Sequence, residues 1–191
     1  VGQHAARFLA EKGARVVAVS DSRGAIYDAD GIDVNALIDV KRAGGAVTSH
    51  DVGEKLERDA LLDVDCDVWI PAARPDVLTA DNVHRIKAKV IAEGANIPAT
   101  DEAERLLAER GVLVLPDFIA NAGGVICAAV ELAGGTEADA MRMIDDKIRG
   151  NLRRVLELSA ADNELPRAAA AKLSRARVLE AMANNAKQSQ K

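Results

Sequence analysis

Short apolar runs that alternate with amphipathic helical stretches constrain the fold of this 191-residue chain more than any other feature. Four such runs, rich in valine, isoleucine and leucine, cover residues 15–19, 67–70, 89–92 and 112–115. Continuous apolar strands are typical of a parallel sheet that is covered by helices on both faces. We therefore predict an α/β fold with a doubly wound, Rossmann-like parallel sheet whose strands end at one common edge.

Helices are predicted between the strands and after the last one. Between the strands they are expected at residues 33–43, 54–62, 79–86 and 102–109, the last one capped by Thr100 or Asp101. Two long apolar stripes, beginning near Thr136 and at Pro166, predict a C-terminal helical hairpin. We expect a single domain with a core over residues 1–134, C-terminal helices over 135–185 and a polar tail over 186–191.

Composition argues against several kinds of partner. A formal net charge of −5 with 2% aromatic residues is unlike a nucleic-acid-binding surface, which is usually basic and carries stacking rings. No apolar run approaches the ~20 residues that span a bilayer, so no membrane partner is expected. The three histidines are scattered, and Cys66 and Cys127 lack metal-like spacing. We therefore expect no metal site, and reduced core cysteines in a cytoplasmic protein.

Small, polar or glycine residues follow each predicted strand. They are Ser20, Asp21 and Ser22; Pro71, Ala72 and Ala73; Glu93, Gly94, Ala95 and Asn96; and Asn121, Ala122, Gly123 and Gly124. In a parallel sheet these segments gather at the carboxyl edge, where ligands bind. Any one of them could be an ordinary loop, but together they predict a ligand-lined rim.

Val1 and Gly2, followed by a helix, a strand and Asp21 nineteen positions after Gly2, have the form of the back half of a dinucleotide fingerprint. In that fingerprint the last glycine packs the helix on the strand, and the acid binds ribose hydroxyls. Such a carboxylate repels a 2′-phosphate and favours NAD, although Ser22 and Arg23 leave NADP possible. Alternatively, Asp21 caps a turn with Ser22.

Five motifs, in this order, resemble the nucleotide-binding domain of the glutamate/leucine/phenylalanine/valine dehydrogenases. They are VGQHAA (1–6), VAVSDS (17–22), IPAA (70–73), AEGAN (92–96) and PDFIANAGGV (116–125). The resemblance runs to about residue 183 and implies one dinucleotide-binding domain. It also implies NAD(P)-dependent oxidative deamination of an L-amino acid, glutamate first, to a 2-oxo acid and ammonia.

The resemblance assigns roles to individual residues. Val1 and Gly2 would lie at the pyrophosphate, Asp21 and Ser22 at the adenosine ribose, Ala72 and Ala73 along the adenosine half, and Gly94, Ala95, Asn96 and Asn121 at the nicotinamide, with Asn121 also near the substrate. The family's catalytic lysine and aspartate belong to a preceding domain, which this chain lacks together with the first strand and the first two glycines of the fingerprint. We therefore expect a fragment that is inactive alone and that forms a homo-oligomer through the missing domain.

Ala128 departs from the pattern of the glutamate-specific members, which place a serine there to bind the substrate's side-chain carboxylate. With Val125 at i and Ala128 at i+3, the two would form an apolar wall of the substrate pocket. This favours an apolar amino acid as the alternative to glutamate. The sequence is also compatible with a non-catalytic dinucleotide-sensing module, or with another Rossmann dehydrogenase of the malic type.

Overall fold

The computed structural model describes the backbone of residues 1–188 and the side chains of residues 1–184. The predicted tail at 186–191 therefore lies partly outside the described residues. Contacts divide the chain into two compact units, Val1–Leu113 and Val114–Lys191. The single domain with a boundary after residue 134 stays a prediction.

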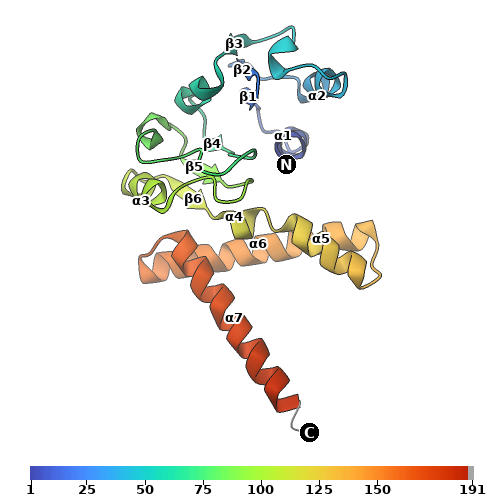
Figure 1. The fold of residues 1–191 in the computed structure, drawn as a ribbon, viewed down its shortest axis with the longest axis vertical. Helices are drawn as coiled ribbons and strands as arrows, with labels where there is room; N and C mark the ends of the chain where they lie inside the picture. The colour runs from blue at the N-terminus through green and yellow to red at the C-terminus, as the bar shows by residue number, and fades with distance from the viewer. Residues whose placement is uncertain (189–191) are drawn as a thin grey trace. The chain divides into compact units, whose positions relative to one another are not determined.

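The first unit holds short strands, helices and 3-10 turns (Figure 1). In chain order these are α1 (Gly2–Glu11), β1 (Ala18–Asp21), β2 (Gly24–Tyr27), α2 (Val34–Arg42), η1 (Val47–Ser49), β3 (Glu54–Leu56), η2 (Arg58–Asp63), β4 (Val68–Trp69), η3 (Val83–Arg85), β5 (Val90–Ala92) and α3 (Asp101–Glu109), with β6 (Leu113–Leu115) beginning at its last residue. The strands form two three-stranded sheets, in the orders β1-β2-β3 and β4-β5-β6. The predicted α/β class is confirmed.

The first sheet is antiparallel, so the prediction that its first strand is parallel is wrong. β1 and β2 form a hairpin in which Asp21 pairs with Gly24 across a two-residue turn. The Asp21 side chain accepts a hydrogen bond from the Arg23 N–H at 2.8 Å, and Gly24 adopts a φ of +145° that favours glycine. The helix predicted at 54–62 is also wrong, because β3 pairs antiparallel with β2 and only η2 follows.

In the second sheet β4 and β5 pair in parallel, as predicted. Val68 of β4 pairs with Val90 of β5, and the Leu113 N–H donates to the Lys89 carbonyl at 2.9 Å. A clear doubly wound sheet is nevertheless not observed, because no strand among residues 1–188 joins β1 to β4. The helix predicted at 79–86 is mostly a loop, in which the Asn82 side chain accepts from the Thr79 N–H and donates to the Val77 carbonyl.

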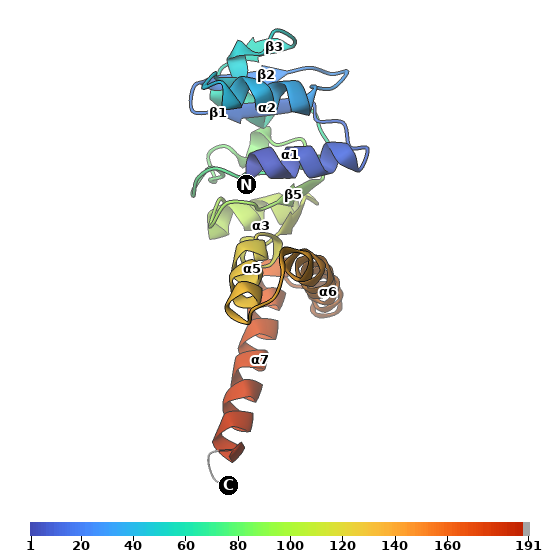
Figure 2. The ribbon, with the colours of Figure 1, turned by 90° about the vertical axis from the view of Figure 1, so that its right-hand side faces the viewer.

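Buried apolar side chains form the core of the first unit. Ile26 of β2 packs in a cluster with Ile32, Leu37 and Val47, and Leu78, Ile86, Ile91 and Leu107 are also fully buried. Asp33 caps α2, and the predicted cap of α3 at Thr100 is confirmed. Helix α1 has no buried residue, and Figure 2 shows it between the antiparallel sheet and strand β5. Val1 and Gly2, at its N-terminal end, are exposed.

The second unit is helical, and its predicted C-terminal hairpin is confirmed. It holds α4 (Asp117–Ala120), α5 (Gly123–Leu132), α6 (Glu137–Asp162) and α7 (Pro166–Gln188). Helix α6 contacts α4, α5 and α7. Thr136 and Asp139 form a capping box at its start, and Asn163 ends it in the left-handed conformation.

Two glycines of this unit give opposite predictions for stability. A Cβ at Gly150, inside α6, would meet nothing within 4 Å. We expect Gly150→Ala to raise the free energy of unfolding by about 0.5–1 kcal/mol, because alanine favours a helix over glycine. A Cβ at Gly135 would lie 2.5 Å from Val130 Cγ1, so Gly135→Ala is expected to lower the free energy of unfolding. Urea denaturation measures the free energy of unfolding of both variants. A less stable Gly150→Ala would contradict the open space that the structure shows around Gly150.

Candidate functional site

The N-terminus of α1 lies against the loops that follow β4 and β5. A Cβ built at Gly2 would lie 3.5 Å from the Cβ of Ala72. A Cβ at Gly94 would lie 3.3 Å from the same atom and 3.1 Å from Val1 Cγ1. Val1, Gly2, Ala72 and Gly94, which we name the α1 entrance site, are thus brought together from three segments.

Backbone hydrogen bonds hold the two loops of this site to each other. The N–H groups of Gly94 and Ala95 donate to the carbonyl of Pro71 at 3.0 and 2.8 Å. Pro71 is buried two residues after the end of β4, and Glu93 is buried directly after β5. A larger side chain at position 94 would collide with Val1 and Ala72, so glycine allows this close approach.

The electrostatics of the α1 entrance site suit an anion. No side chain caps the N-terminus of α1, and its first turn has no acidic residue. The first N–H groups of a helix lack partners within it and carry partial positive charge, so they bind phosphate groups. The start of α1 therefore offers the electrostatic surroundings that a phosphate group favours.

Asp21 has a separate environment, built by β1, α2 and η1. Its Oδ1 accepts from the Arg23 N–H, and its Oδ2 accepts from the Val47 N–H at 3.0 Å and the Lys41 ammonium at 2.6 Å. Burial raises the pKa of Asp21, but the hydrogen bonds from Lys41, Arg23 and Val47 outweigh it and hold the pKa below its usual value. The carboxylate is therefore ionised, and the hydrogen bond from the Arg23 N–H closes the turn at the end of β1.

Lys41 was not expected beside this carboxylate, because sequence predicts it only as a solvated residue of α2. Its side chain is 34% exposed and forms an ion pair with Asp21 across twenty positions of sequence. The signal that could have indicated it is its place in the last turn of a helix that follows the hairpin. A cation thus accompanies the predicted ribose-binding acid.

The remaining predicted positions are distributed over both units. In the first unit, Ser22, Ala73 and Asn96 are exposed and Ala95 is half-buried.

In the second unit, Asn121 follows the one-turn helix α4, and its N–H donates to the Asp117 carbonyl at 2.7 Å. Val125 and Ala128 are exposed residues of α5, which begins at Gly123. Their position on one helix allows the predicted apolar wall.

The two cysteines have different surroundings in the structure. Cys127 is exposed, so the prediction that both cysteines are core residues is wrong for it. Because α5 is apolar on all sides, no periodicity identified its exposed face. Cys66 is half-buried, and burial with the neighbouring Asp65 and Asp67 raises the pKa of its thiol.

Among the described residues, no group of His, Cys, Asp or Glu is arranged to hold a metal ion, and no helix is long and apolar enough to cross a membrane.

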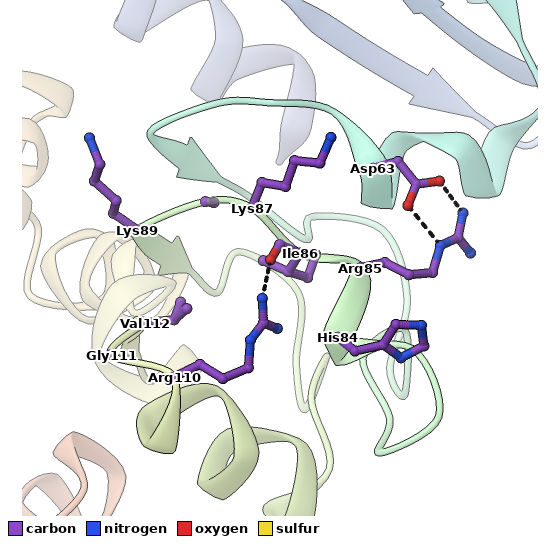
Figure 3. A pocket seen from close by; sticks show the side chains of 10 residues that line it. Asp63, His84, Arg85, Ile86, Lys87, Lys89, Arg110, Gly111 and Val112 are labelled. Atoms are coloured by element: carbon purple, nitrogen blue, oxygen red, sulfur yellow. Dashed lines mark hydrogen bonds and ion pairs between the residues drawn. The ribbon is translucent and has the colours of Figure 1, made fainter.

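A basic pocket of about 710 Å³ lies beside the residues that precede β5 and β6 (Figure 3). Its basic side chains are His84, Arg85, Lys87, Lys89 and Arg110. Arg85 pairs with Asp63 at 2.6 Å, and Lys89 pairs with Asp67 at 2.9 Å. Arg110 donates to backbone carbonyls, including that of Ile86 at 2.6 Å. These contacts join the segments before the strands, at the ends opposite the α1 entrance site.

Comparison with known proteins shows the family. A family model described as glutamate/leucine/phenylalanine/valine dehydrogenase matches residues 1–186. The glutamate dehydrogenase of Aeropyrum pernix is 47% identical over 162 residues, which are 82% of this chain and 39% of that protein. The NADP-specific glutamate dehydrogenase of Saccharolobus shibatae is 39% identical over 191 residues, which are 95% of this chain and 45% of that protein.

A solved structure agrees with these relatives. The hetero-hexameric glutamate dehydrogenase from Thermus thermophilus, in its Leu-bound form, matches with a TM-score of 0.82 and 25% identity over 95% of this chain and 44% of that one. The chain thus spans less than half the length of the relatives it matches. Because the family model covers almost all of its residues, the chain belongs to the glutamate/leucine/phenylalanine/valine dehydrogenase family.

Proposed function

We propose that this chain is the cofactor-binding part of an NAD(P)-dependent amino acid dehydrogenase, which converts an L-amino acid to a 2-oxo acid and ammonia. The observation that carries the proposal is the uncapped N-terminus of α1 beside Ala72 and Gly94, in a chain of this family. Glutamate is the first substrate to test, because the relatives described above are named glutamate dehydrogenases.

The chain's own residues bind and orient the cofactor in this proposal. When bound, the nicotinamide accepts a hydride from the amino acid's Cα. The N–H groups at the start of α1 hold the pyrophosphate, and the absence of side chains at Gly2 and Gly94 permits its approach. The other assigned residues are Val1 at the pyrophosphate, Asp21 and Ser22 at the adenosine ribose, Ala72 and Ala73 along the adenosine half, and Ala95, Asn96 and Asn121 at the nicotinamide. No catalytic acid or base is assigned to this chain.

The charges around Asp21 support NAD as the preferred cofactor with some use of NADP. Its ionised carboxylate accepts hydrogen bonds from ribose hydroxyls and repels a 2′-phosphate. The Lys41 ammonium offsets part of that repulsion, because it lies 2.6 Å from the carboxylate. The NADP-specific relative from Saccharolobus shibatae shows that a member of the family uses the phosphorylated cofactor.

The partner in this proposal is a small amino acid rather than nucleic acid or a membrane. A homo-oligomeric, cytoplasmic enzyme is part of the same proposal, and the hexameric relative from Thermus thermophilus supports an assembly.

The experiment that tests the function uses the full-length protein with NAD or NADP. A panel of amino acids and hydroxy acids is offered, and the absorbance of reduced nicotinamide is followed. Amino acids are expected to be oxidised. Activity with hydroxy acids alone would support a malic-type dehydrogenase. Cofactor binding without any turnover would support a sensing module.

A second candidate substrate class, the apolar amino acids, is favoured by the side chains of α5. Val125 is 77% exposed, and Ala128 is exposed on the same helix three positions on. Neither side chain can donate a hydrogen bond to a substrate carboxylate, which would lose water without gaining a partner there. The expected enzyme therefore uses apolar amino acids well or binds glutamate weakly.

Ala128→Ser tests this candidate directly. The variant should shift the ratio of kcat/KM values toward glutamate by about tenfold, because a hydrogen bond to a charged group contributes about 1.5 kcal/mol. Ala129→Ser, at the next exposed position of α5, is the matched control and should leave the ratio unchanged. A wild-type enzyme that strongly prefers glutamate, with no gain in Ala128→Ser, would show that specificity is set elsewhere.

A further inference from the structure

The segment that carries Asn121 is too short to hold its own shape. Helix α4 is the single turn Asp117–Ala120, and an isolated turn is unstable because nucleating a helix costs more than one hydrogen bond returns. Asn121 is attached to it by its N–H, which donates to the Asp117 carbonyl at 2.7 Å. The placement of Asn121 therefore depends on whatever holds Asp117.

Arg167, in the first turn of α7, holds two consecutive residues of α4. Its Nη1 donates to Asp117 Oδ1 at 2.9 Å, and its guanidinium carbon lies 5.6 Å from the centroid of the Phe118 ring. The Asp117 side chain is 8% exposed and that of Arg167 is 24% exposed. A partly buried pair is screened less by water than a surface pair, and a planar guanidinium can serve a carboxylate and a ring together.

The apolar side of α4 is fixed by the same helix. Ile119 packs with Val155 of α6 and with Ala169 and Ala170 of α7, and the last three have no exposed surface. Three consecutive residues of one turn are thus held, Asp117 by the ion pair, Phe118 by the ring contact and Ile119 by apolar packing. This leaves α4 little freedom to rotate while Arg167 is in place.

The start of α7 is itself anchored, so Arg167 has a firm support. Pro166 begins the helix, and the Ser159 hydroxyl donates to the Glu164 carbonyl at 2.6 Å just before it. Lys172 pairs with the Glu164 carboxylate at 2.6 Å. Arg167 therefore lies in a helical turn that is fixed on both sides, by the Ser159 hydrogen bond before it and by the Lys172 ion pair after it.

We propose that Arg167 is a positioning residue for Asn121. Through Asp117 it fixes the rotation of α4, and thereby the direction in which the Asn121 carboxamide points. The inference rests on the proposed function, in which Asn121 borders the nicotinamide and the amino acid. Arg167 does not touch either ligand in this scheme.

Four variants of the full-length protein test the inference. Arg167→Met removes both the positive charge and the planar set of N–H donors. Arg167→Lys keeps only the charge, and Asp117→Asn keeps the shape of the acceptor but not its charge. Arg175→Met is the matched control, because Arg175 is an exposed arginine of the same helix. Each is also combined with Asn121→Ala.

The first measurement is amide hydrogen exchange of residues 117–122 in the folded protein, which needs no activity. Exchange there should be about tenfold faster in Arg167→Met, intermediate in Arg167→Lys and unchanged in Arg175→Met, since a charged hydrogen bond is lost. Unchanged exchange in Arg167→Met would overturn the inference. If that variant does not fold, the same criterion applies to Asp117→Asn.

The second measurement is steady-state kinetics. Arg167→Met should lower kcat/KM for the amino acid about tenfold and leave the cofactor dissociation constant within about twofold, with partial rescue in Arg167→Lys. Adding it to Asn121→Ala should cause no further loss, because both changes remove the same oriented group. If the losses in kcat/KM of the two single variants multiply in the double variant, the inference is overturned. Absence of any amino acid oxidation by the wild type would instead refute the proposed function, while exchange still decides the positioning role.

Discussion

Gly2→Asp in the full-length protein is expected to weaken NAD(P) binding by at least about a hundredfold while leaving the protein folded. Like charges about 4 Å apart repel by about 4 kcal/mol at an effective dielectric of about 20, and about 2.7 kcal/mol already gives a hundredfold loss. The new carboxylate would sit where the N–H groups of α1 receive the pyrophosphate. Titration of the protein with reduced cofactor measures the effect.

The same substitution should not damage the fold, which separates binding from stability. A Cβ at Gly2 makes only ordinary contact, 3.5 Å from Ala72 Cβ, and an acidic residue in the first turn stabilises a helix by about 0.3–1 kcal/mol. Gly2→Asn supplies a control of nearly the same shape without the charge, so it measures the loss of space alone, and Gly2→Asp should weaken binding further. Equal losses in both variants would mean that space, not charge, governs the site.

Asp21→Ala is expected to raise the Michaelis constant for NAD by about ten- to a hundredfold and to improve the use of NADP. Losing a charged hydrogen-bonding group costs about 1.5–3 kcal/mol, and the variant also removes the charge that repels a 2′-phosphate. Kinetics with both cofactors measure the change. Unaltered constants for both would remove Asp21 from the ribose site.

Lys41→Met gives the opposite test of the same charge pair. In this variant Lys41 no longer offsets the negative charge of Asp21, so the repulsion of a 2′-phosphate increases. The Michaelis constant for NADP should therefore rise about tenfold, while that for NAD changes little. Lys55→Met, at an exposed lysine of β3, is the control. If both lysine variants behave alike, Lys41 contributes no more than net charge.

Features set by neighbouring residues were predictable from sequence. The caps at Thr100 and Thr136 each satisfy an N–H group three residues ahead, so the signal and the structure occupy the same few positions. The C-terminal hairpin followed from two long apolar stripes and Pro166. The parallel pairing of β4 and β5 followed from their continuous apolar runs.

Features that depend on pairing between segments were not predictable in the same way. The run after Asp21 was interpreted as a loop of the rim, although a two-residue turn followed by Gly-Ala-Ile-Tyr is also a hairpin signal. Residues 54–62 carry a helical pattern, but hydrogen bonds to β2 make the first three a strand. Tertiary pairing overrides local preference in both places.

In the candidate site, too, local features were predictable from sequence and contacts between distant segments were not. Gly2 was identified from the form of a dinucleotide fingerprint and Gly94 from the segment that follows a predicted strand, and the structure places both beside Ala72. Lys41 and Arg167 were not identified, because their partners lie 20 and 50 positions away and no local pattern connects them. The roles of Asn121, Val125 and Ala128 remain predictions.

Hydrogen exchange of the full-length protein with and without NADH tests the central claim most directly. If the α1 entrance site binds the dinucleotide, saturating cofactor should slow amide exchange at residues 2–5 and in the loops at 71–73 and 93–96. The basic pocket at residues 84–89 should exchange at an unchanged rate and serves as the internal control. Cofactor that binds without slowing exchange at residues 2–5 would contradict the account.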